Sequence, residues 1–348
     1  MLTERENYIR TVRMTGPEWI PAQLNLSDAL WNELREELDD VLARHPILYP
    51  NHEPHDWSTW QPRRRAGTTE RDPWGVLWDF DYDGVEGQAI EHPLDDWAKF
   101  DGFEPPDPMK YTDRREMDWD EWHANVRAKK EQGKLTKAGL DHGYFLMRLW
   151  YLRGFENLMV DFATGEPRLR DLCEMVTRRN LARVEQFIHA GVDAVYFGED
   201  LGTQTASIIS PADFREWVLP YYRRMMAPVR QAGIIVDTHS DGYIMELADL
   251  LLEAGADVLN PQDLCNGIDA IEREIKGRCC IKLDVDRQKI IPFGTPEEIR
   301  ALIEEETRRL GSPAGGLSFI VGVYPPTPPE NVHALLSAFE EFRTYWWE

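Results

Sequence analysis

The feature of this sequence that most restricts its fold is a series of short apolar segments, rich in β-branched residues, in its second half. They are VDAVYFG (192–198), GIIVDT (233–238), ADVLN (256–260), CCIKL (279–283) and LSFIVG (317–322). Continuous apolar segments of this length are typical of parallel strands that are buried on both faces. Because parallel strands need long crossover connections, the spacing between the segments predicts repeated βα units.

Helix-start signals follow several of these segments. Ser210, Thr295 and Thr327 each precede a proline and, three residues on, a carboxylate, which is the pattern of an N-cap, an N1 proline and an acidic first turn. A closed barrel or an open doubly wound sheet would both satisfy this alternation, but no GxGxxG motif follows any segment to support a dinucleotide fold. For 348 residues, the economical prediction is one TIM-type (β/α)8 barrel at residues 138–348 behind an N-terminal extension.

The predicted extension, residues 1–137, has a different character. One helix is expected from Ser27 to Arg44, and a long stretch rich in Trp, Pro, His and Asp follows it with little periodicity. Its aromatic residues offer large areas for burial, so we expect irregular structure that packs on the barrel and walls the active site. Three histidines in it lack a metal-ligand spacing and are interpreted as surface loop residues: His45, His52 and His55.

Composition limits the partners and the compartment. The 62 acidic and 39 basic residues give a net charge of −23, which argues against nucleic acid and anionic membranes as partners. No apolar run is long enough to span a bilayer, and the charged start does not resemble a signal peptide, so the cytoplasm is expected. The four cysteines show no zinc-finger spacing and are expected to be reduced: Cys173, Cys265, Cys279 and Cys280.

Polar residues follow each predicted strand, where a parallel barrel gathers its active site. Carboxylates and an imidazole at one mouth would serve either divalent metal binding or acid/base chemistry. For a single member such as Asp263 or Asp286, solvation or helix capping is an equally good explanation. The candidates are Glu199, Asp200, Gln204, His239, Asp241, Asn260, Gln262, Asp284, Asp286 and Tyr324.

His239 is the leading candidate because it ends an otherwise buried segment, in VDTHSDG. Residues two apart on a strand lie on the same side, so His239 and Asp241 are predicted to point together into the mouth of the barrel. The pair would then act as metal ligands or as a base and its orienting group. A hydrogen-bonded core histidine is the alternative.

Six segments together resemble successive blocks of the uroporphyrinogen decarboxylase superfamily. They are YLRGFENLMVDFA (151–163), FGEDLGTQTASIISPADFREWVLPYYRR (197–224), VDTHSDG (236–242), AGADVLNPQD (254–263), LDVDRQKIIPFGTPEEIR (283–300) and PPTPPEN (325–331). The resemblance implies a TIM-type barrel and one of two chemistries. These are decarboxylation of porphyrinogens without a cofactor, and zinc-dependent methyl transfer that involves corrinoid proteins or thiols.

The methyltransferase branch is the better match. The decarboxylases carry an N-terminal arginine signature of the type PVWxMRQAGR, whereas this chain has only WQPRRRAG (60–67). The methyltransferases that this chain resembles hold zinc with a His-x-Cys pair and a later cysteine. Here Asp241 stands at the first cysteine position and the second falls near Val321. The resemblance therefore implies a sulfur-free zinc site made by His239, Asp241 and Glu199.

These observations predict a methyltransferase that moves a methyl group from a small methoxylated or methylated compound, aromatic or apolar, to a corrinoid protein. His239, Asp241, Glu199 and Tyr324 are the predicted catalytic residues. The alternatives are a cofactor-free decarboxylase that uses Asp284 or Asp286 with His239 and Tyr324, and a barrel that binds a ligand without catalysis. The oligomeric state is left open, with a homo-oligomer allowed. The predicted substrate-binding residues are Asp200, Gln204, Asn260, Gln262, Asp284 and Asp286.

Overall fold

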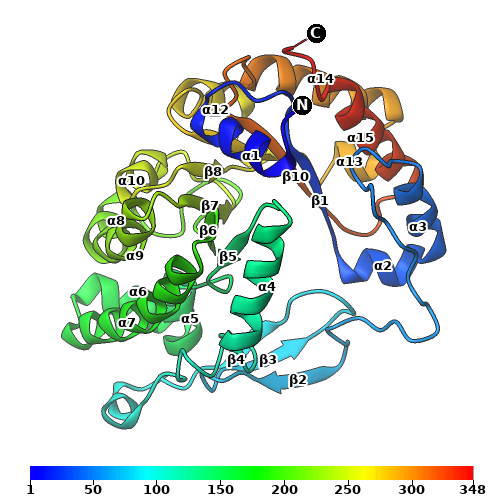
Figure 1. The fold of residues 1–348 in the computed structure, drawn as a ribbon. Coiled ribbons are helices and arrows are strands. Elements are labelled where there is room, and N and C mark those ends of the chain that lie inside the picture. The colour runs from blue at the N-terminus through cyan, green and yellow to red at the C-terminus, as the bar shows by residue number, and fades with distance from the viewer. Residues whose placement is uncertain (348) are drawn as a thin grey trace.

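A computed structural model describes residues 1–347 as a curled parallel sheet with helices around its outer side (Figure 1). The sheet has seven strands in the order β1-β10-β9-β8-β7-β6-β5. These strands are β1 (Ala22–Leu26), β5 (Lys137–Gly139), β6 (Ala194–Asp200), β7 (Ile235–Asp241), β8 (Val258–Asn260), β9 (Cys280–Asp284) and β10 (Leu317–Val323). The prediction of a TIM-type α/β fold is confirmed, with seven parallel strands in place of eight in this sheet.

All five strands predicted from apolar segments are present, each within three residues of its predicted bounds. Two of the three predicted N-caps are also confirmed. Ser210 accepts a hydrogen bond from the backbone of Asp213, and Thr295 forms a capping box with Glu298. The third lies one residue off, because the N-cap of the last helix is Pro328 and not Thr327.

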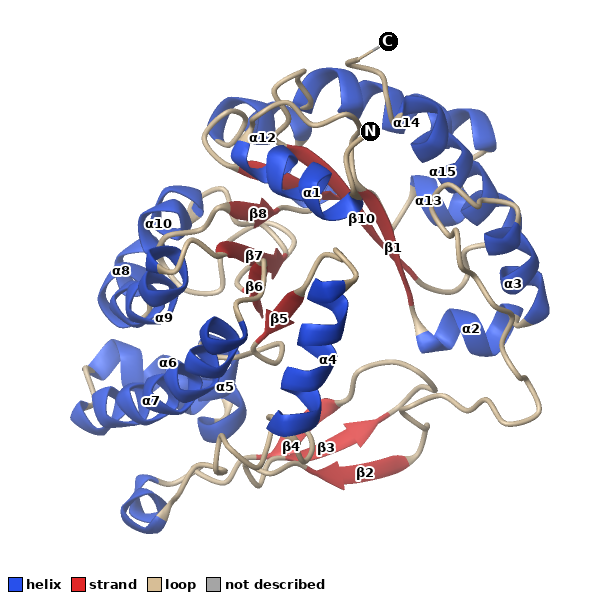
Figure 2. Cartoon of the chain, in the orientation of Figure 1, coloured by secondary structure: helices blue, strands red, loops and turns tan. Residues whose placement is uncertain are grey.

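Helices link these strands and cover the outer side of the sheet (Figure 2). Long helices pack on the sheet through buried apolar residues. The four cysteines form no disulfide bond, and three of them are buried. The helices from residue 146 on are α5 (Leu146–Arg153), α6 (Phe155–Thr164), α7 (Pro167–Ala190), α8 (Pro211–Trp217), α9 (Leu219–Gln231), α10 (Ala248–Ala254), α11 (Asp263–Asn266), α12 (Ile268–Glu274), α13 (Ile290–Phe293), α14 (Pro296–Leu310) and α15 (Pro329–Phe342).

Residues 1–137 are more regular than expected. They supply β1, which pairs in parallel with β10, so the barrel sheet takes one strand from this part of the chain. They also form a separate antiparallel sheet in the order β2-β3-β4. The elements are α1 (Glu4–Arg13), α2 (Asp28–Leu34), α3 (Glu36–Ala43), β2 (Thr68–Arg71), β3 (Leu77–Phe80), β4 (Gln88–Glu91), the 3-10 helix η1 (Trp97–Gly102) and α4 (Trp119–Glu131).

Two predictions for this region are wrong in detail. The single helix expected from Ser27 to Arg44 is broken at Arg35, whose φ of +45° lies in the left-handed region and separates α2 from α3. His45 is not a surface residue, because it is 2% exposed and contacts Glu340 and His333 through its two ring nitrogens. His52 and His55 are half-buried and both contact Asp39.

A buried ionic network joins the small sheet region to the barrel helices. Asp113 is fully buried and contacts Arg148 of α5 at 3.1 Å, Arg179 of α7 at 2.6 Å and the indole nitrogen of Trp74 at 3.0 Å. Asp72 adds a second carboxylate, 3.4 Å from Arg148. The network therefore holds the small sheet beside the barrel. None of the helices described has the length and apolar character that crossing a membrane requires.

Candidate functional site

A cavity of about 920 Å³ lies over the carboxyl ends of the parallel strands. Parallel strands all end at one edge of the sheet, so their last residues meet there. The small sheet and the loops beside it form the opposite wall. The cavity is lined on the barrel side by Asn25, Asp141, His142, Tyr196, Asp200, His239, Asp241, Asn260, Lys282, Asp284, Arg287 and Tyr324, and on the other side by Arg63, Arg64, Trp78, Glu86, Ala89 and Arg114.

Three of these side chains bring potential metal-ligand atoms together. One atom each of His142, Asp200 and His239 lies within 4.8 Å of the other two. Asp200 Oδ1 is 3.1 Å from His142 Nε2 and 3.9 Å from His239 Nε2. The same oxygen is buried and accepts no well-aligned hydrogen bond from the described residues. Although burial opposes it, the Asp200 carboxylate raises the pKa of His142.

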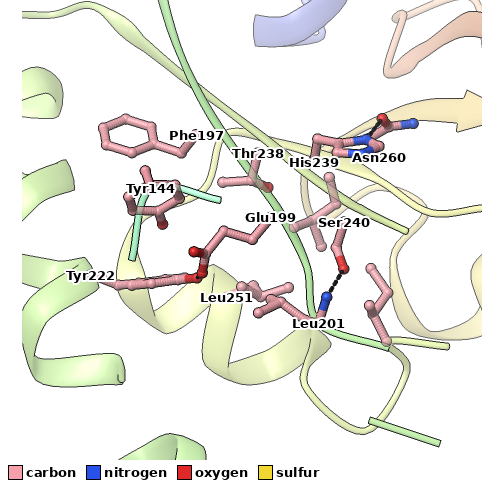
Figure 3. A pocket seen from close by; sticks show the side chains of 12 residues that line it. Tyr144, Phe197, Glu199, Leu201, Tyr222, Thr238, His239, Ser240, Leu251 and Asn260 are labelled. Atoms are coloured by element: carbon pink, nitrogen blue, oxygen red, sulfur yellow. Dashed lines mark hydrogen bonds between the residues drawn. The ribbon is translucent and has the colours of Figure 1, made fainter. Parts of the chain in front are cut away.

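His239 is held in one orientation by its neighbours. Its Nδ1 lies 2.5 Å from Asn260 Oδ1 (Figure 3). The Asn260 amide in turn donates to the carbonyl of Lys282. Because an amide oxygen only accepts, Nδ1 carries the proton and Nε2 presents its lone pair to Asp200. The ring of Tyr196 stacks on the imidazole with centroids 6.1 Å apart. Burial lowers the pKa of His239, which favours the neutral form that binds metal ions.

Asp241 lies beside this cluster but is engaged elsewhere. Its Oδ2 is 2.6 Å from Arg287 Nη2, and its Oδ1 accepts a hydrogen bond of 3.0 Å from Gln262. The distance from Asp241 Oδ1 to His239 Nε2 is 3.5 Å, so the two predicted partners do share one side of β7. Arg287 also contacts Asp284, whose pKa burial raises to about 7.

Glu199 does not reach the metal-ligand cluster. Its carboxylate accepts hydrogen bonds from the backbone N–H groups of Phe145, Leu146 and Met147, at 2.6, 3.0 and 3.2 Å, and from the Tyr222 hydroxyl. Glu199 thus caps the first turn of α5 on the outer side of β6, among Tyr144, Phe197 and Tyr222 (Figure 3). Burial raises its pKa. The predicted role of Glu199 as a metal ligand finds no geometric support.

Three other predicted residues do not line the main cavity. Gln262 donates to Asp241 and accepts from the backbone of Gly242. Asp286 accepts from three backbone N–H groups in the turn that leads into α13, at Gln288, Lys289 and Ile290. Gln204, Gln262 and Asp286 line a separate hollow of only about 10 Å³. Tyr324 does line the main cavity, with its ring centroid 5.7 Å from the Arg287 guanidinium carbon.

The sequence interpretation missed His142 and Arg287. His142 follows β5 in the segment KAGLDHG. Like VDTHSDG, this segment has a histidine and an aspartate within the three residues before a glycine. This similarity could have identified His142 as a site residue from the sequence. However, β5 is only three residues long and is not recognisable as an apolar segment. Arg287 lies three residues beyond the end of β9 and had no such signal.

Comparison with known proteins assigns the family. The model of the family described as Uroporphyrinogen decarboxylase (URO-D) matches residues 78–342 of the chain. This chain belongs to the uroporphyrinogen decarboxylase family. The match includes every residue of the metal-ligand cluster, so the cluster lies within the family's common fold.

Curated relatives in this family are distant. A uroporphyrinogen decarboxylase of Nocardia farcinica is 30% identical over 177 residues, which are 49% of this chain and 48% of that protein. One from Geotalea daltonii is 24% identical over 277 residues, 76% of this chain and 74% of its own length. The first relatives are matched by this chain over about half of their length, between 45% and 48%.

Among solved structures, a methyltransferase from Methanosarcina mazei superposes over nearly the whole molecule. The TM-score is 0.68 at 14% sequence identity, and the match covers 98% of this chain and 99% of that chain. At this identity the likeness shows a shared fold. It extends over residues 1–137 as well as the barrel, so the segment that walls the cavity belongs to the shared architecture.

Proposed function

We propose that this protein is a methyltransferase that moves a methyl group from a small methoxylated or methylated compound to a corrinoid protein. The observation that carries the proposal is the convergence of His142, Asp200 and His239 on one side of a large cavity. A methyltransferase among the proteins of the same fold supports it. We also propose that it works in the cytoplasm, as its sequence led us to expect.

The three side chains fit a catalytic zinc ion. Two imidazole nitrogens and a carboxylate oxygen form a ligand set that catalytic zinc sites use, with a position left open for the substrate. The buried Asp200 Oδ1, which accepts no well-aligned hydrogen bond from residues 1–347, is the kind of atom that a cation would satisfy. When bound, the ion would supply Lewis acidity at the methyl-bearing oxygen of the donor. The proposed ligand set replaces the set expected from the sequence, since only His239 is common to both.

The chain itself supplies orientation around this centre. Asn260 fixes the tautomer of His239 through the 2.5 Å contact with Nδ1, and the ring of Tyr196 lies over the imidazole. Arg287 and Gln262 hold the Asp241 carboxylate beside the cluster. These contacts pre-organise the site before a substrate enters, which is how a protein lowers the cost of reaching the reactive geometry.

In the proposed reaction the bond between the methyl carbon and the donor oxygen breaks. The oxygen keeps the bonding pair and takes a proton, and the methyl carbon bonds to the reduced cobalt of the acceptor, which provides the two electrons. Tyr324 lines the cavity, and burial raises the pKa of its hydroxyl. We therefore assign Tyr324 as a proton donor for the leaving oxygen, since it stays protonated at neutral pH.

Metal analysis combined with an acceptor assay tests the proposal. The purified protein should hold one zinc ion per chain, and both His142→Ala and His239→Ala should lose it. Gln204→Ala, outside the cavity, should keep it. The wild-type protein should convert cob(I)alamin to methylcobalamin with at least one donor among methanol, anisole and 3-methoxybenzoate. Full activity without zinc, or no methylation from any of these donors, would refute the proposal.

Cofactor-free decarboxylation is the second candidate, and two observations favour it. Asp284, with a pKa raised to about 7, lies 3.4 Å from Arg287 in the same cavity as His239 and Tyr324, as a proton-transferring group would need. The curated relatives are also named as decarboxylases. Release of carbon dioxide from a carboxylated substrate by zinc-free protein would establish this reaction. Ligand binding that survives His239→Ala, with no turnover of either kind, would instead indicate a binding protein.

A further inference from the structure

Two arginines on the wall opposite the metal-ligand cluster flank a single carboxylate. Arg64 Nη2 is 3.8 Å from Glu86 Oε1, and Arg114 Nη2 is 3.6 Å from Glu86 Oε2. Each guanidinium group thus faces one oxygen of the same carboxyl group. Glu86 is 71% exposed, so neither contact is expected to contribute much stability. The side chain of Glu86 is therefore only weakly held between the two guanidinium groups.

Both arginines are held in place by their surroundings. Arg114 stacks over the ring of Trp78 with its guanidinium carbon 3.8 Å from the ring centroid, and Arg64 lies 5.3 Å from the centroid of Phe80. Their side chains are only 24% and 23% exposed. The Arg64 carbonyl also accepts a hydrogen bond from Gly84, at 2.9 Å. The two guanidinium groups are therefore held in position before a ligand binds.

The hydrogen-bonding capacity of these two groups is not used. Arg64 Nε is buried and has no hydrogen-bond partner among residues 1–347, and the contacts to Glu86 are longer than hydrogen bonds. The Nη2 groups that face Glu86 at 3.8 and 3.6 Å can therefore donate to a carboxylate that enters the cavity. Arg63 next to it is different, because it forms two hydrogen bonds to Asp28, at 3.0 and 3.1 Å.

We infer that a carboxylate of the methyl donor binds between Arg64 and Arg114 and displaces the side chain of Glu86. Two guanidinium groups that already face the two oxygens of one carboxyl group match carboxylate geometry. Trp78, Trp150, Tyr151 and Tyr196 line the same cavity and offer apolar faces for the rest of the molecule. The inference rests on the proposed function for the identity of the substrate, but it concerns binding and needs no turnover.

Calorimetric binding of two matched probes tests the inference. The probes are 3-methoxybenzoate and its neutral analogue 3-methoxybenzamide, titrated into the full chain as purified and without a corrinoid acceptor. The wild-type protein should bind the carboxylate at least tenfold more tightly than the amide. Charge-assisted hydrogen bonds of this kind change affinity by about 10- to 100-fold, so R64Q and R114Q should each remove this preference. E86Q should strengthen carboxylate binding, because it removes the competing anion.

Matched controls separate this site from general electrostatics. R115Q removes an equal charge from the exposed position next to Arg114, and R65Q does the same next to Arg64; both should leave the preference unchanged. Equal binding of the two probes, no binding of the carboxylate, or a loss in R115Q as large as in R114Q would overturn the inference. Because no methyl transfer occurs in this assay, a failure of the proposed reaction leaves its result intact.

Discussion

Asn260 Oδ1 lies 2.5 Å from His239 Nδ1, so the last residue of β8 sets the tautomer of a histidine near the end of β7. Parallel pairing of the two strands puts His239 directly opposite Asn260 in the register. The Asn260 amide is itself fixed by the carbonyl of Lys282 on β9. Three adjacent strands therefore cooperate to aim one imidazole nitrogen at Asp200.

Replacing Asn260 by alanine should weaken zinc binding without abolishing it. The variant keeps all three proposed ligands but loses the acceptor that orients His239, and such outer contacts are worth about 10- to 100-fold in metal affinity. Competition with a chelator of known affinity measures the change. Q204A is the control, since Gln204 lies outside the cavity. Unchanged affinity in N260A would show that the contact between Asn260 and His239 does not contribute to zinc binding.

Replacing Glu199 by alanine should destabilise the fold but spare metal binding. The substitution leaves three backbone N–H groups at the start of α5 without their acceptor, and removes the carboxylate that accepts from the Tyr222 hydroxyl. A loss of about 2–4 kcal/mol in the free energy of unfolding is expected from buried donors without partners. Urea unfolding measures the loss, and metal analysis of the folded variant should still find one zinc ion. Folded E199A without zinc would restore the role that the sequence suggested.

The contrast between Glu199 and Asp200 shows what the sequence could predict. The apolar segment before them located β6 and the site at its end, and that prediction is confirmed. Successive residues of a strand point to opposite faces, however, and no pattern in the sequence says which of the two faces the cavity. In the fold, Tyr196 and Asp200 face the cavity, whereas Phe197 and Glu199 face the helices.

Long-range pairing explains most of what the sequence did not predict. The apolar series located the later strands, but β1 joins β10 across nearly 300 residues of chain and has no distinctive local pattern. The metal-ligand cluster likewise takes His142 from after the three-residue β5. Asp241, which its spacing favoured as a metal ligand, instead contacts Arg287. This contact depends on the conformation of the loop after β9, which the sequence does not reveal.

Stability should fall as the pH rises because of a buried carboxyl pair behind the site. Asp263 and Glu306 are buried next to each other, and burial raises the pKa of Asp263 to about 6 and that of Glu306 well above its usual value. The native state then binds more protons than the unfolded state above about pH 4, so stability is highest below the unfolded pKa values and is lost through pH 6 and beyond. Unfolding by urea at pH 5 and pH 8 measures this slope.

The variant E306Q should reduce that slope. It keeps a hydrogen-bond donor for Asp263 and cannot ionise, so it should be about 2 kcal/mol more stable than the wild-type protein at pH 8, with little difference at pH 5. E305Q, at the exposed neighbouring position, is the matched control. Equal slopes in E306Q and the wild-type protein would mean that the pair does not share a proton in the native state.

Removing Asp113 should detach the wall of the cavity from the barrel. Its carboxylate lies between Arg148 and Arg179, and their charges hold its pKa well below the usual value even though burial opposes this. D113A leaves two buried guanidinium groups short of a partner, which costs about 3–5 kcal/mol. Urea unfolding measures this cost, and D81A, at an exposed aspartate that also lies in residues 1–137, is a control that should change little.

Because an acid with a lowered pKa stabilises the native state above its unfolded pKa, the wild-type protein should lose this contribution as the pH falls below about 4, whereas D113A should not. A cost below 1 kcal/mol would show that the network does not hold the small sheet against α5 and α7.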